Sequence, residues 1–339
     1  MNISQTSLAR QLGVSRSAVS HVLNGREHMV SPETRERIQA AVEVAGYHRN
    51  ALVRALKTHR THMSGIVVPE ASLSFFTDII MGAEAEAQKS NMRCFLCQSH
   101  SNSTTLEQHV ASLREYRVDG MLIVPSSSTI DPGVFHSLQE HKVPFVLIDN
   151  PVDGVKSAFV GTENTRAGVL ATEHLLALGH RRIVCVKGYE SSWPTRYRYE
   201  GYVNAHTRAD VPLDPQLVIK GGFSFEDGQI AVEKLIQSGI PFTAIVVAAD
   251  AVAIGAIHAL ARHGLRVPQD VSVVGCGNID MAAMFMPALT TVDQKPQEVG
   301  REAMQLLLRQ IEQRKLSTNT ITVDPSLVER ASTCPPRTR

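Results

Sequence analysis

Apolar residues in the first 46 positions recur at helical spacing and fall into three short runs. Leu8 and Leu12 belong to the first run, and Val19 and Val22 to the second. This spacing puts the apolar side chains of each run on one face of a helix, where they can share a small core. Gly13 separates the first two runs and supplies the backbone freedom that a tight turn needs. The pattern predicts a small all-α helix-turn-helix head.

The second and third runs carry residues that are typical of helix ends. Ser15 is placed to cap the second helix, and Ser31 to cap the third. Pro32 occupies the first position of the third helix, and Gly46 follows its end. We therefore expect helices to begin after Ser15 and Ser31.

From Gly65 onward, short apolar runs alternate with segments of helical spacing. The apolar runs are 65–69, 94–97, 120–124, 145–148, 183–186, 217–219, 244–247 and 271–274. The helical segments between them include 78–90, 104–116, 166–178, 227–238 and 252–263. Continuous apolar strands that alternate with helices indicate parallel sheets covered on both faces. The pattern predicts an α/β region of two doubly wound lobes.

Charge is unevenly distributed along the 339 residues. Residues 1–62 have a formal charge of +5, and the remaining residues have −4. A basic head favours a polyanionic partner for the head alone, although chance alone can also produce such a split. Residues 1–12 lack the apolar region of an export signal, and no run approaches the about 18 apolar residues of a membrane span. We expect a cytoplasmic chain with no membrane partner.

Five cysteines are scattered along the chain, which is typical of a protein from a reducing compartment. Cys94 and Cys97 form a C-x-x-C motif inside an apolar run that we interpret as a strand. Residues three apart on a strand point to opposite faces, so these two cannot share a metal ion. We expect two buried thiols, and neither a metal site nor a cofactor.

Several motifs, in this order and spacing, closely resemble those of the LacI/GalR family of bacterial transcription regulators. The head carries LGVSRSAVSHVLNG at 12–25 and VSPETRERI at 30–38. The rest of the chain carries matching motifs at 46–47, 50, 54–56, 75–76, 118–120, 174–175, 179–180, 254–256, 267–268 and 287–292. Each motif is weak alone, but together they cover nearly the whole chain.

The resemblance implies four parts. It implies a helix-turn-helix head over 1–48, a hinge helix and linker over 49–62, an effector-binding and dimerisation domain over 63–333, and a tail over 334–339. The two lobes, like those of periplasmic binding proteins of type I, are expected over 63–162 with 293–322 and over 163–292 with 323–333. The implied function is that of a homodimeric repressor, which binds double-stranded operator DNA under the control of a small molecule bound between the lobes.

The second helix should present its polar face to DNA. Arg16, Ser17, Ser20 and His21 lie opposite the apolar face of this helix. Arginine can donate two parallel hydrogen bonds to guanine, and histidine can donate to the same acceptors. The family's base-reading positions fall on Arg16, Ser17 and His21, and its phosphate-contacting positions fall on Ser15 and Asn24. The alternative is that these residues only solvate a surface helix.

The linker resembles the family's hinge helix. Leu56 matches the apolar residue that enters the minor groove and kinks the duplex, and Asn50 and Val53 belong to the same DNA-contacting segment. Val53 and Arg49 depart from the usual alanine and proline, and β-branched Val53 lowers helix propensity. The alternative for Leu56 is packing against the lobes.

The effector site is expected at the carboxyl ends of the strands, between the lobes. Aromatic residues that follow strands suit the flat apolar face of a sugar or base, although core packing is the usual alternative for any one of them. Arg198 resembles the family's cleft arginine, which binds hydroxyls or a carboxylate. The candidate effector-binding residues are Phe75, Phe76, Asp149, Trp193, Arg198, Phe223 and Asp250.

Two departures from the family pattern concern the effector. Ala249-Asp250 stands where the family often has Asn-Asp, and Gly277 stands where it usually has an aspartate. Loss of a carboxylate near Arg198 favours an anionic ligand. We therefore expect a sugar, and in particular a sugar acid.

Two other classes of protein were considered. The segment Gly275–Asp280 partly resembles a dinucleotide-binding motif, but Asp280 stands where the third glycine is needed. A periplasmic binding protein shares the two lobes but needs an export signal and has no use for residues 1–62. We expect a DNA-binding regulator and not an enzyme.

Overall fold

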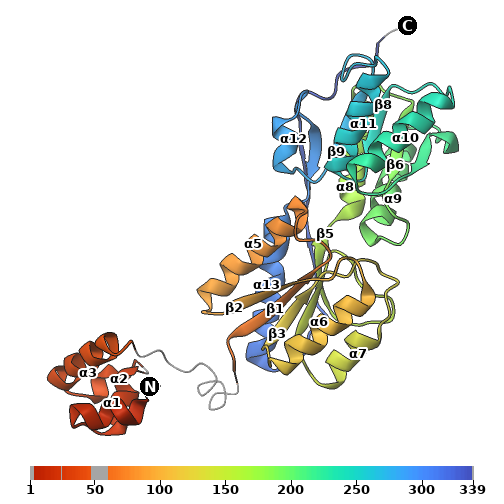
Figure 1. Ribbon diagram of the computed structural model, residues 1–339. Coiled ribbons are helices and arrows are strands. Elements are labelled where there is room, and N and C mark those ends of the chain that lie inside the picture. The colour runs from red at the N-terminus through yellow and green to blue at the C-terminus, as the bar shows by residue number, and fades with distance from the viewer. Residues whose placement is uncertain (1–3, 24, 47–59, 338–339) are drawn as a thin grey trace. The chain divides into compact units, whose positions relative to one another are not determined.

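The computed structural model describes residues 4–23, 25–46 and 60–337 (Figure 1). The chain divides into two compact units, Met1–Thr61 and His62–Arg339. Each unit is described by itself below.

The described residues of the first unit form three short α-helices around a small core. Its elements are α1 Gln5–Leu12, α2 Arg16–Leu23, a 3₁₀ turn Glu27–Met29 and α3 Pro32–Val44. Leu8, Val19 and Ile38 are fully buried in this core. Gly13 has a left-handed φ of +64° at the end of α1, which gives the tight turn before α2. The predicted helix-turn-helix head is confirmed.

Serine residues occupy the expected positions before α2 and α3, but only Ser15 uses its hydroxyl to cap the helix that follows. The Ser15 hydroxyl accepts a hydrogen bond from the backbone N–H of Ala18 at 3.1 Å and so caps α2. Ser31 occupies the N-cap position of α3, but its hydroxyl donates to the Thr34 hydroxyl at 2.9 Å instead of accepting from the backbone. Pro32 lacks a backbone N–H, so this helix start has one fewer donor to satisfy.

The second unit contains two lobes, each built on a six-stranded sheet in the part of the chain that the structure describes. The strand order of the first sheet is β11-β5-β4-β3-β1-β2, with every neighbouring pair parallel. The elements of this lobe are β1 Met63–Val68, α5 Ser74–Lys89, β2 Arg93–Gln98, α6 Ser103–Glu115, β3 Gly120–Ile123, α7 Gly133–Glu140, β4 Phe145–Ile148, β5 Ala158–Thr162, α13 Pro296–Gln313 and β11 Thr320–Val323.

The second sheet has the order β12-β10-β9-β8-β6-β7, and only β12 runs antiparallel to its neighbour among these strands. The elements of this lobe are α8 Asn164–Ala177, β6 Ile183–Lys187, α9 Trp193–Arg208, a 3₁₀ turn Pro215–Leu217, β7 Val218–Lys220, α10 Phe225–Gln237, β8 Ala244–Val247, α11 Asp250–Arg262, β9 Ser272–Cys276, α12 Asp280–Met284, β10 Thr290–Asp293 and β12 Ser326–Val328. The predicted pair of doubly wound lobes is confirmed.

The chain crosses between the lobes three times. The crossovers follow β5, β10 and β11, and they comprise residues 163, 294–295 and 324–325. A hydrogen bond joins the first two crossovers. The Thr162 hydroxyl, at the end of β5, donates to the carbonyl oxygen of Gln294 on the crossover after β10 at 3.0 Å. Short segments that cross between two lobes in this way can act as a hinge.

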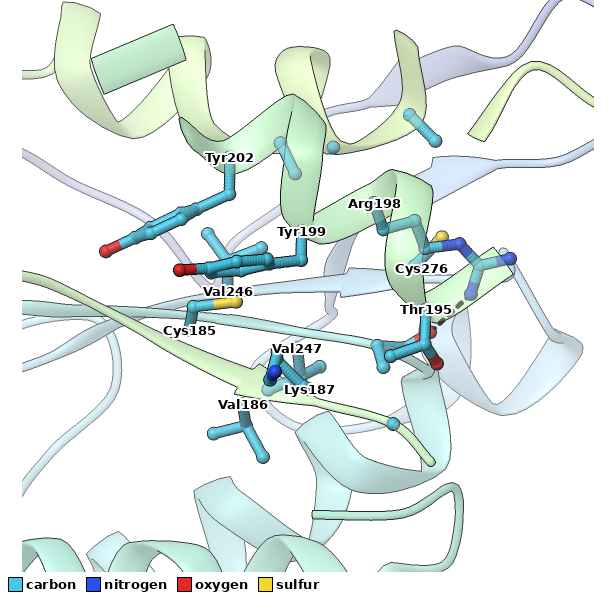
Figure 2. Close-up of a pocket in the computed structure, with 15 residues that line it drawn as sticks. Cys185, Val186, Lys187, Thr195, Arg198, Tyr199, Tyr202, Val246, Val247 and Cys276 are labelled. Atoms are coloured by element: carbon cyan, nitrogen blue, oxygen red, sulfur yellow. Dashed lines mark hydrogen bonds between the residues drawn. The ribbon is translucent and has the colours of Figure 1, made fainter. Parts of the chain in front are cut away.

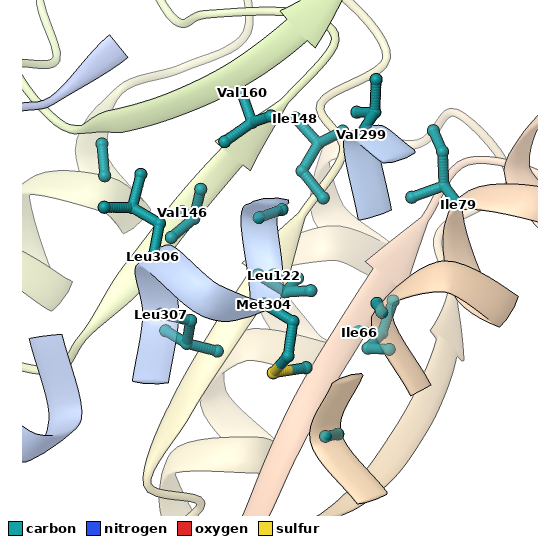
Figure 3. Packing of buried hydrophobic residues seen from close by; sticks show 14 of the residues in the cluster. Ile66, Ile79, Leu122, Val146, Ile148, Val160, Val299, Met304, Leu306 and Leu307 are labelled. Carbon is teal, nitrogen blue, oxygen red and sulfur yellow. The ribbon is translucent and has the colours of Figure 1, made fainter. Parts of the chain in front are cut away.

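One of the two cores of the first lobe lies between its sheet and the helices α5 and α13, and the other lies between the opposite face of the sheet and the helices α6 and α7. Figure 3 shows side chains from strands and from α5 and α13 meeting in the first of these cores. Ile66 and Leu122 on the sheet and Met304 on α13 are fully buried. Residues of α13 therefore complete a core that begins more than 200 positions earlier in the sequence.

Glycines bring α8 and α9 into close contact and thereby fix the position of Arg198. A Cβ atom at Gly168 would lie 2.0 Å from the carbonyl oxygen of Arg198, and one at Gly201 would lie 2.1 Å from the carbonyl oxygen of Thr165. Any side chain at these positions would push the two helices apart. The backbone of Arg198 is therefore held directly against α8.

The C-x-x-C pair lies on β2, as predicted, with its two side chains on opposite faces. Cys94 packs against the core that contains Ile66, and Cys97 against the core that contains Val67. We expected both thiols to be buried. They are only half-buried, because β2 is the edge strand of its sheet. Among the described residues, no group of three His, Cys, Asp or Glu side chains is placed to hold a metal ion.

Residues 334–337, which we expected to belong to a tail, are bonded to the second lobe. The backbone N–H of Cys334 donates to the Ser272 hydroxyl at 3.0 Å, and Nε2 of buried His180 lies 2.9 Å from the Cys334 carbonyl oxygen. Arg337 forms an ion pair with Asp270 at 2.7 Å. The lobe therefore extends at least to Arg337. None of the described helices is both long enough and apolar enough to span a bilayer.

Candidate functional site

Helix α2 presents a polar face opposite its buried one. Arg16 and Ser17 are exposed, and Ser20 and His21 are half-buried. Buried Val19 fixes the opposite face of the helix in the core. The Ser15 hydroxyl, which caps the helix, also lies 2.9 Å from that of Ser17.

The predicted DNA-contacting residues divide into two groups. Those on α2 and at its cap are gathered on one surface, where the side chain of Arg16 reaches solvent. Asn24, Asn50, Val53 and Leu56 lie outside the described residues. The surface formed by Arg16, Ser17, Ser20 and His21 is therefore the part of the candidate DNA interface that has a defined geometry.

Arg198 lies at the carboxyl end of the second sheet, one turn into α9. Its Nη1 donates to the carbonyl oxygen of Ala248 at 2.6 Å, directly after β8. Its Nε donates to Oδ1 of Asn164 at 2.9 Å, and its Nη2 donates to Oε1 of Gln294. The guanidinium therefore joins a strand end to residues beside two crossovers.

Asp149 follows β4 of the first lobe and is almost completely buried. Its φ is +65°, and it is 8% exposed. Burial raises the pKa of its carboxyl to about 6, and the positive charge of Arg198 opposes this rise. Asn150 donates from Nδ2 to Oδ2 of Asp149 at 3.4 Å and to the carbonyl oxygen of Pro125 at 3.1 Å. The end of β4 therefore places a titratable group within the electrostatic influence of Arg198.

The predicted aromatic residues form separate pairs. Phe75 and Phe76 meet edge to face, with ring centroids 5.4 Å apart, and pack against the first-lobe core. Trp193 packs on Tyr197 with a centroid distance of 4.4 Å. These contacts leave both pairs half-buried at the start of a helix. The backbone N–H of Trp193 also donates to Oδ1 of Asn150 at 2.9 Å, which joins α9 to the first lobe.

Phe223 forms a third aromatic pair in the second lobe. Its ring meets that of Tyr189 edge to face at 5.5 Å. The two residues follow β7 and β6, so their rings lie at the carboxyl end of the second sheet. Tyr189 is 54% exposed and offers an accessible aromatic face there.

Asp250 is buried and holds the loop after β9. Its Oδ2 accepts from the backbone N–H of Ile279 at 3.0 Å, and its Oδ1 accepts from the hydroxyl of Thr291. A Cβ atom at Gly277 would lie 3.2 Å from Oδ2 of Asp250, and the φ of Gly277 is +146°. The carboxylate of Asp250 therefore satisfies backbone and side-chain donors of its own lobe, beside the position where the expected aspartate is missing.

A pocket lies beneath α9, between this helix, α8 and the second sheet (Figure 2). Its lining includes Cys185, Tyr199 and Tyr202, with Thr195 and Arg198 at the end where β6 and β8 finish. Of the seven predicted effector residues, only Arg198 lines it. The lining is mostly apolar and the cavity has a volume of only about 20 Å³, room for about one water molecule, so it is too small to hold a sugar.

The raised pKa of Asp149 predicts that the wild type and the Asp149→Asn variant differ in stability by an amount that depends on pH. A raised pKa means that the folded state binds the proton more tightly, so its stabilisation is present at low pH and is lost as the pH rises through about 6. Asp149→Asn avoids the burial of a charge and is expected to be more stable than the wild type above pH 7, by up to about 3 kcal/mol. This difference should vanish near pH 4. Thermal unfolding of both proteins between pH 4 and 8 measures it.

The control for this prediction is Asp153→Asn, at an exposed position four residues away. Burial lowers the pKa of His174, His180 and His206, so these histidines destabilise the fold on acidification. They do so equally in all three proteins and cancel in the difference. A gap between wild type and Asp149→Asn that stays constant with pH would contradict the prediction.

Sequence reasoning missed four residues of this region. Asn164 and Gln294 bind Arg198, and Tyr189 and Tyr197 complete two aromatic pairs. Tyr197 lies four residues after Trp193, and this helical spacing gave a usable signal for their contact. Tyr189 gave none, because its partner Phe223 is distant in the sequence. The two carboxamides gave none, because Gln294 is 96 residues from Arg198 in the sequence.

Comparisons with known proteins agree with this architecture. Residues 7–50 match the family described as bacterial regulatory proteins, lacI family, and residues 172–333 match the periplasmic binding protein-like domain. The ribose operon repressor of Escherichia coli (strain K12) is 32% identical over 326 residues, which cover 96% of this chain and 98% of the relative.

Solved structures give the same result. The lac repressor dimer bound to operator and the anti-inducer ONPF has a TM-score of 0.87 and 26% identity, and the match covers 98% of this chain and 100% of that one. The transcriptional regulator CelR in complex with cellobiose has a TM-score of 0.75 and 29% identity, with 97% and 99% covered.

Proposed function

Because the chain belongs to the lacI family of bacterial regulatory proteins, we propose that it is a homodimeric transcriptional repressor that binds operator DNA and is controlled by a small effector. The observation that carries this proposal is the exposed polar face of α2 on a separate, basic unit joined to a two-lobed one. The ribose operon repressor and the lac repressor reported above are repressors, which supports a role in binding and not in catalysis. Its place of action is the cytoplasm, where the operator lies.

A dimer is needed because one helix-turn-helix unit reads only a few base pairs. The first lobe offers apolar side chains for this contact at its β2 edge. Leu96 on β2 points to the same side of the sheet as Cys94, where α5 carries Met81, and these two side chains are 50% and 54% exposed. Phe95 points to the opposite side, is 42% exposed and pairs with Tyr116. β2 is also the edge of its sheet, with backbone groups that no neighbouring strand covers (Figure 1). We assign this edge to a second copy of the chain, because the similar lac repressor structure is a dimer.

The second lobe carries another exposed apolar patch. Met281 and Met284 on α12 and Met286 after it are 53%, 76% and 87% exposed. Large apolar side chains clustered at a surface are typical of a protein contact. We assign this patch to the same dimer, with one contact from each lobe.

The effector is a sugar or, as we favour, a sugar acid. The similar proteins include a ribose operon repressor and a regulator in complex with cellobiose. Here, however, Gly277 provides no side chain, and the carboxylate of Asp250 is occupied by Ile279 and Thr291. Arg198 is hydrogen-bonded only to neutral oxygens, so an ionised ligand oxygen would bind it more strongly than a sugar hydroxyl.

The proposed function is tested with the full chain in two steps. Repeated selection from random duplexes, at near-cellular salt, should enrich a palindrome, because two heads related by a two-fold axis read two half-sites. D-gluconate and D-ribose are then titrated against the selected complex, and release by gluconate is expected. A chain that enriches no palindrome contradicts the repressor, and release by ribose alone contradicts the sugar acid.

A further inference from the structure

The first lobe contains a cavity at the end of its sheet opposite the candidate effector residues. The cavity lies between the last turns of α13 and residues 315–319, which lead into β11. β11 runs parallel to β5, so residues 315–319 lie at the amino ends of the strands, whereas the effector candidates of this lobe follow the carboxyl ends of β1 and β4. The volume of the cavity is about 310 Å³, which is within the range of sites for small molecules.

The length of α13 separates this cavity from the lobe crossovers. The helix begins at Pro296, directly after the crossover that follows β10, and ends at Gln313 beside the cavity. Its 18 residues span about 27 Å, because each residue of an α-helix adds about 1.5 Å. A ligand in the cavity and an effector between the lobes therefore occupy separate sites.

The cavity carries positive charge. Arg309 and Lys315 line it, and none of the lining residues is acidic. Neither cation forms an ion pair within the described part of the chain, whereas Arg301, two turns earlier on α13, is paired with Glu298 and Glu302. Nε of Arg309 donates to the carbonyl oxygen of Gln305 on its own helix at 3.3 Å. Two unpaired cations at one cavity favour an anionic ligand.

Buried Gln310 fixes the loop that forms the second wall of the cavity. Its side chain is only 2% exposed, and its Nε2 donates to the carbonyl oxygen of Phe145 on β4 at 3.1 Å. Its Oε1 accepts from the backbone N–H of Ser317 at 3.3 Å. The carbonyl oxygen of Asn319 accepts from the N–H of Phe159 on β5 at 3.0 Å. The loop is therefore held against two strands, and the shape of the cavity exists before a ligand binds.

The lining offers two kinds of contact. Buried Leu306 and half-buried Leu316 supply an apolar surface that suits a carbon skeleton. Exposed Arg309, Lys315 and Thr318 supply N–H and O–H donors. A phosphate group presents three strong acceptor oxygens, and arginine and lysine are its usual partners in proteins. The combination fits a small organic molecule that carries a phosphate.

We propose that this cavity binds a small phosphorylated metabolite. Arg309 and Lys315 hold its phosphate, and Leu306 and Leu316 contact its carbon skeleton. The site is distinct from the effector site and from the DNA-contacting face of α2. The proposal therefore goes beyond the proposed function and does not depend on it.

The first test titrates the full chain, without DNA, with D-ribose 5-phosphate, and inorganic phosphate is the comparison probe. Hydrogen exchange locates the bound probe, and exchange should slow at residues 306–319. Calorimetry should give an affinity for ribose 5-phosphate at least about fivefold higher than for inorganic phosphate, because only the former reaches the apolar surface. Protection confined to the carboxyl ends of the strands would overturn the proposal. Equal affinities would also overturn it, because they would show an ion site only.

The second test removes the two charges one at a time. Arg309→Gln and Lys315→Gln should each weaken ribose 5-phosphate binding by at least about tenfold, because a charge-assisted hydrogen bond is lost. Arg301→Gln is the matched control, because it removes the same charge from α13 at a guanidinium that Glu298 and Glu302 already bind. It should change the affinity less than about twofold. A similar loss in Arg309→Gln and Arg301→Gln would show an effect of overall charge alone and would overturn the site.

The phosphates of DNA are the other source of this chemistry. Without any metabolite, Arg309→Gln and Lys315→Gln should bind a random duplex within about twofold of the wild-type affinity at one fixed salt concentration. A tenfold loss would assign these cations to the DNA backbone and overturn the metabolite site. Calorimetry and hydrogen exchange need no DNA, so they judge this site even if the palindrome selection fails.

Discussion

Replacement of Arg16 by alanine is expected to lower the affinity for the selected operator by at least about 30-fold, while random duplex affinity falls by less than about threefold. One arginine bonded to guanine contributes about 1–3 kcal/mol of discrimination, and a dimer contains two copies, which gives about 2–6 kcal/mol. Non-specific binding depends mainly on phosphate contacts and loses only one charge per head. Fluorescence anisotropy with both duplexes at one fixed salt concentration measures the two effects.

The control for this prediction is Arg10→Ala. Arg10 is exposed in the last turn of α1, so its removal changes the charge of the head equally without touching α2. It should weaken binding to both duplexes by a similar, small factor. If Arg16→Ala instead lowers the two affinities equally, Arg16 contacts phosphate and reads no base.

The elements of the head were predictable because local signals agree there. Each helix has apolar residues at helical spacing, and these include Leu8 on α1, Val19 on α2 and Ile38 on α3. Gly13 marks the end of α1, and Ser15 marks the start of α2. The core of this unit is formed within 46 residues, so short-range patterns decide it. The Ser31 hydroxyl was the exception, because it donates to the hydroxyl of Thr34 and does not accept a hydrogen bond from the backbone of α3.

The longer unit was predictable only in part. The eight apolar runs correspond to β1–β4 and β6–β9, because buried parallel strands are apolar on both faces. β5, β10, β11 and β12 were not among the predicted runs. Helix α9 was also not among the helices predicted from spacing. Its buried face contains Thr195, Gly201 and His206 beside Tyr202, and it packs on α8 through close backbone contact and not through an apolar stripe. Spacing of apolar residues carries no signal for such a helix.

The surroundings of the candidate effector residues could not be obtained from the sequence. A strand end pointed to Asp149 and the family resemblance to Arg198, but neither showed that burial raises the pKa of Asp149 while the charge of Arg198 opposes this rise. Asp250 also follows a strand, yet its carboxylate is used by Ile279 and Thr291. Which way a carboxylate turns is decided by donors that lie 29 and 41 residues away. The order of residues along the chain does not contain that information.

Leu96→Arg is expected to make the protein monomeric and, as a consequence, to abolish specific operator binding. Leu96 is 50% exposed on the edge strand β2, near exposed Met81 of α5, at the edge assigned to a second copy. A buried charge without a partner costs several kcal/mol, and a two-fold interface contains each substitution twice. The dimer dissociation constant should therefore rise by at least about 100-fold. Sedimentation velocity over a concentration series measures it.

The matched control is Ile230→Arg, at an apolar position on α10 of the second lobe that is 49% exposed. It introduces the same charge at a similarly exposed position, outside the assigned edge, and should leave the dimer intact. Circular dichroism and thermal unfolding of both variants establish that the lobes remain folded. Because each head reads one half-site, the monomer should retain only the weak binding of a single head, and its affinity for palindromic and random duplexes should become nearly equal. A Leu96→Arg protein that stays dimeric would place the interface on another face, whereas a monomer that still prefers the palindrome would show that the lobes do not hold the two heads together.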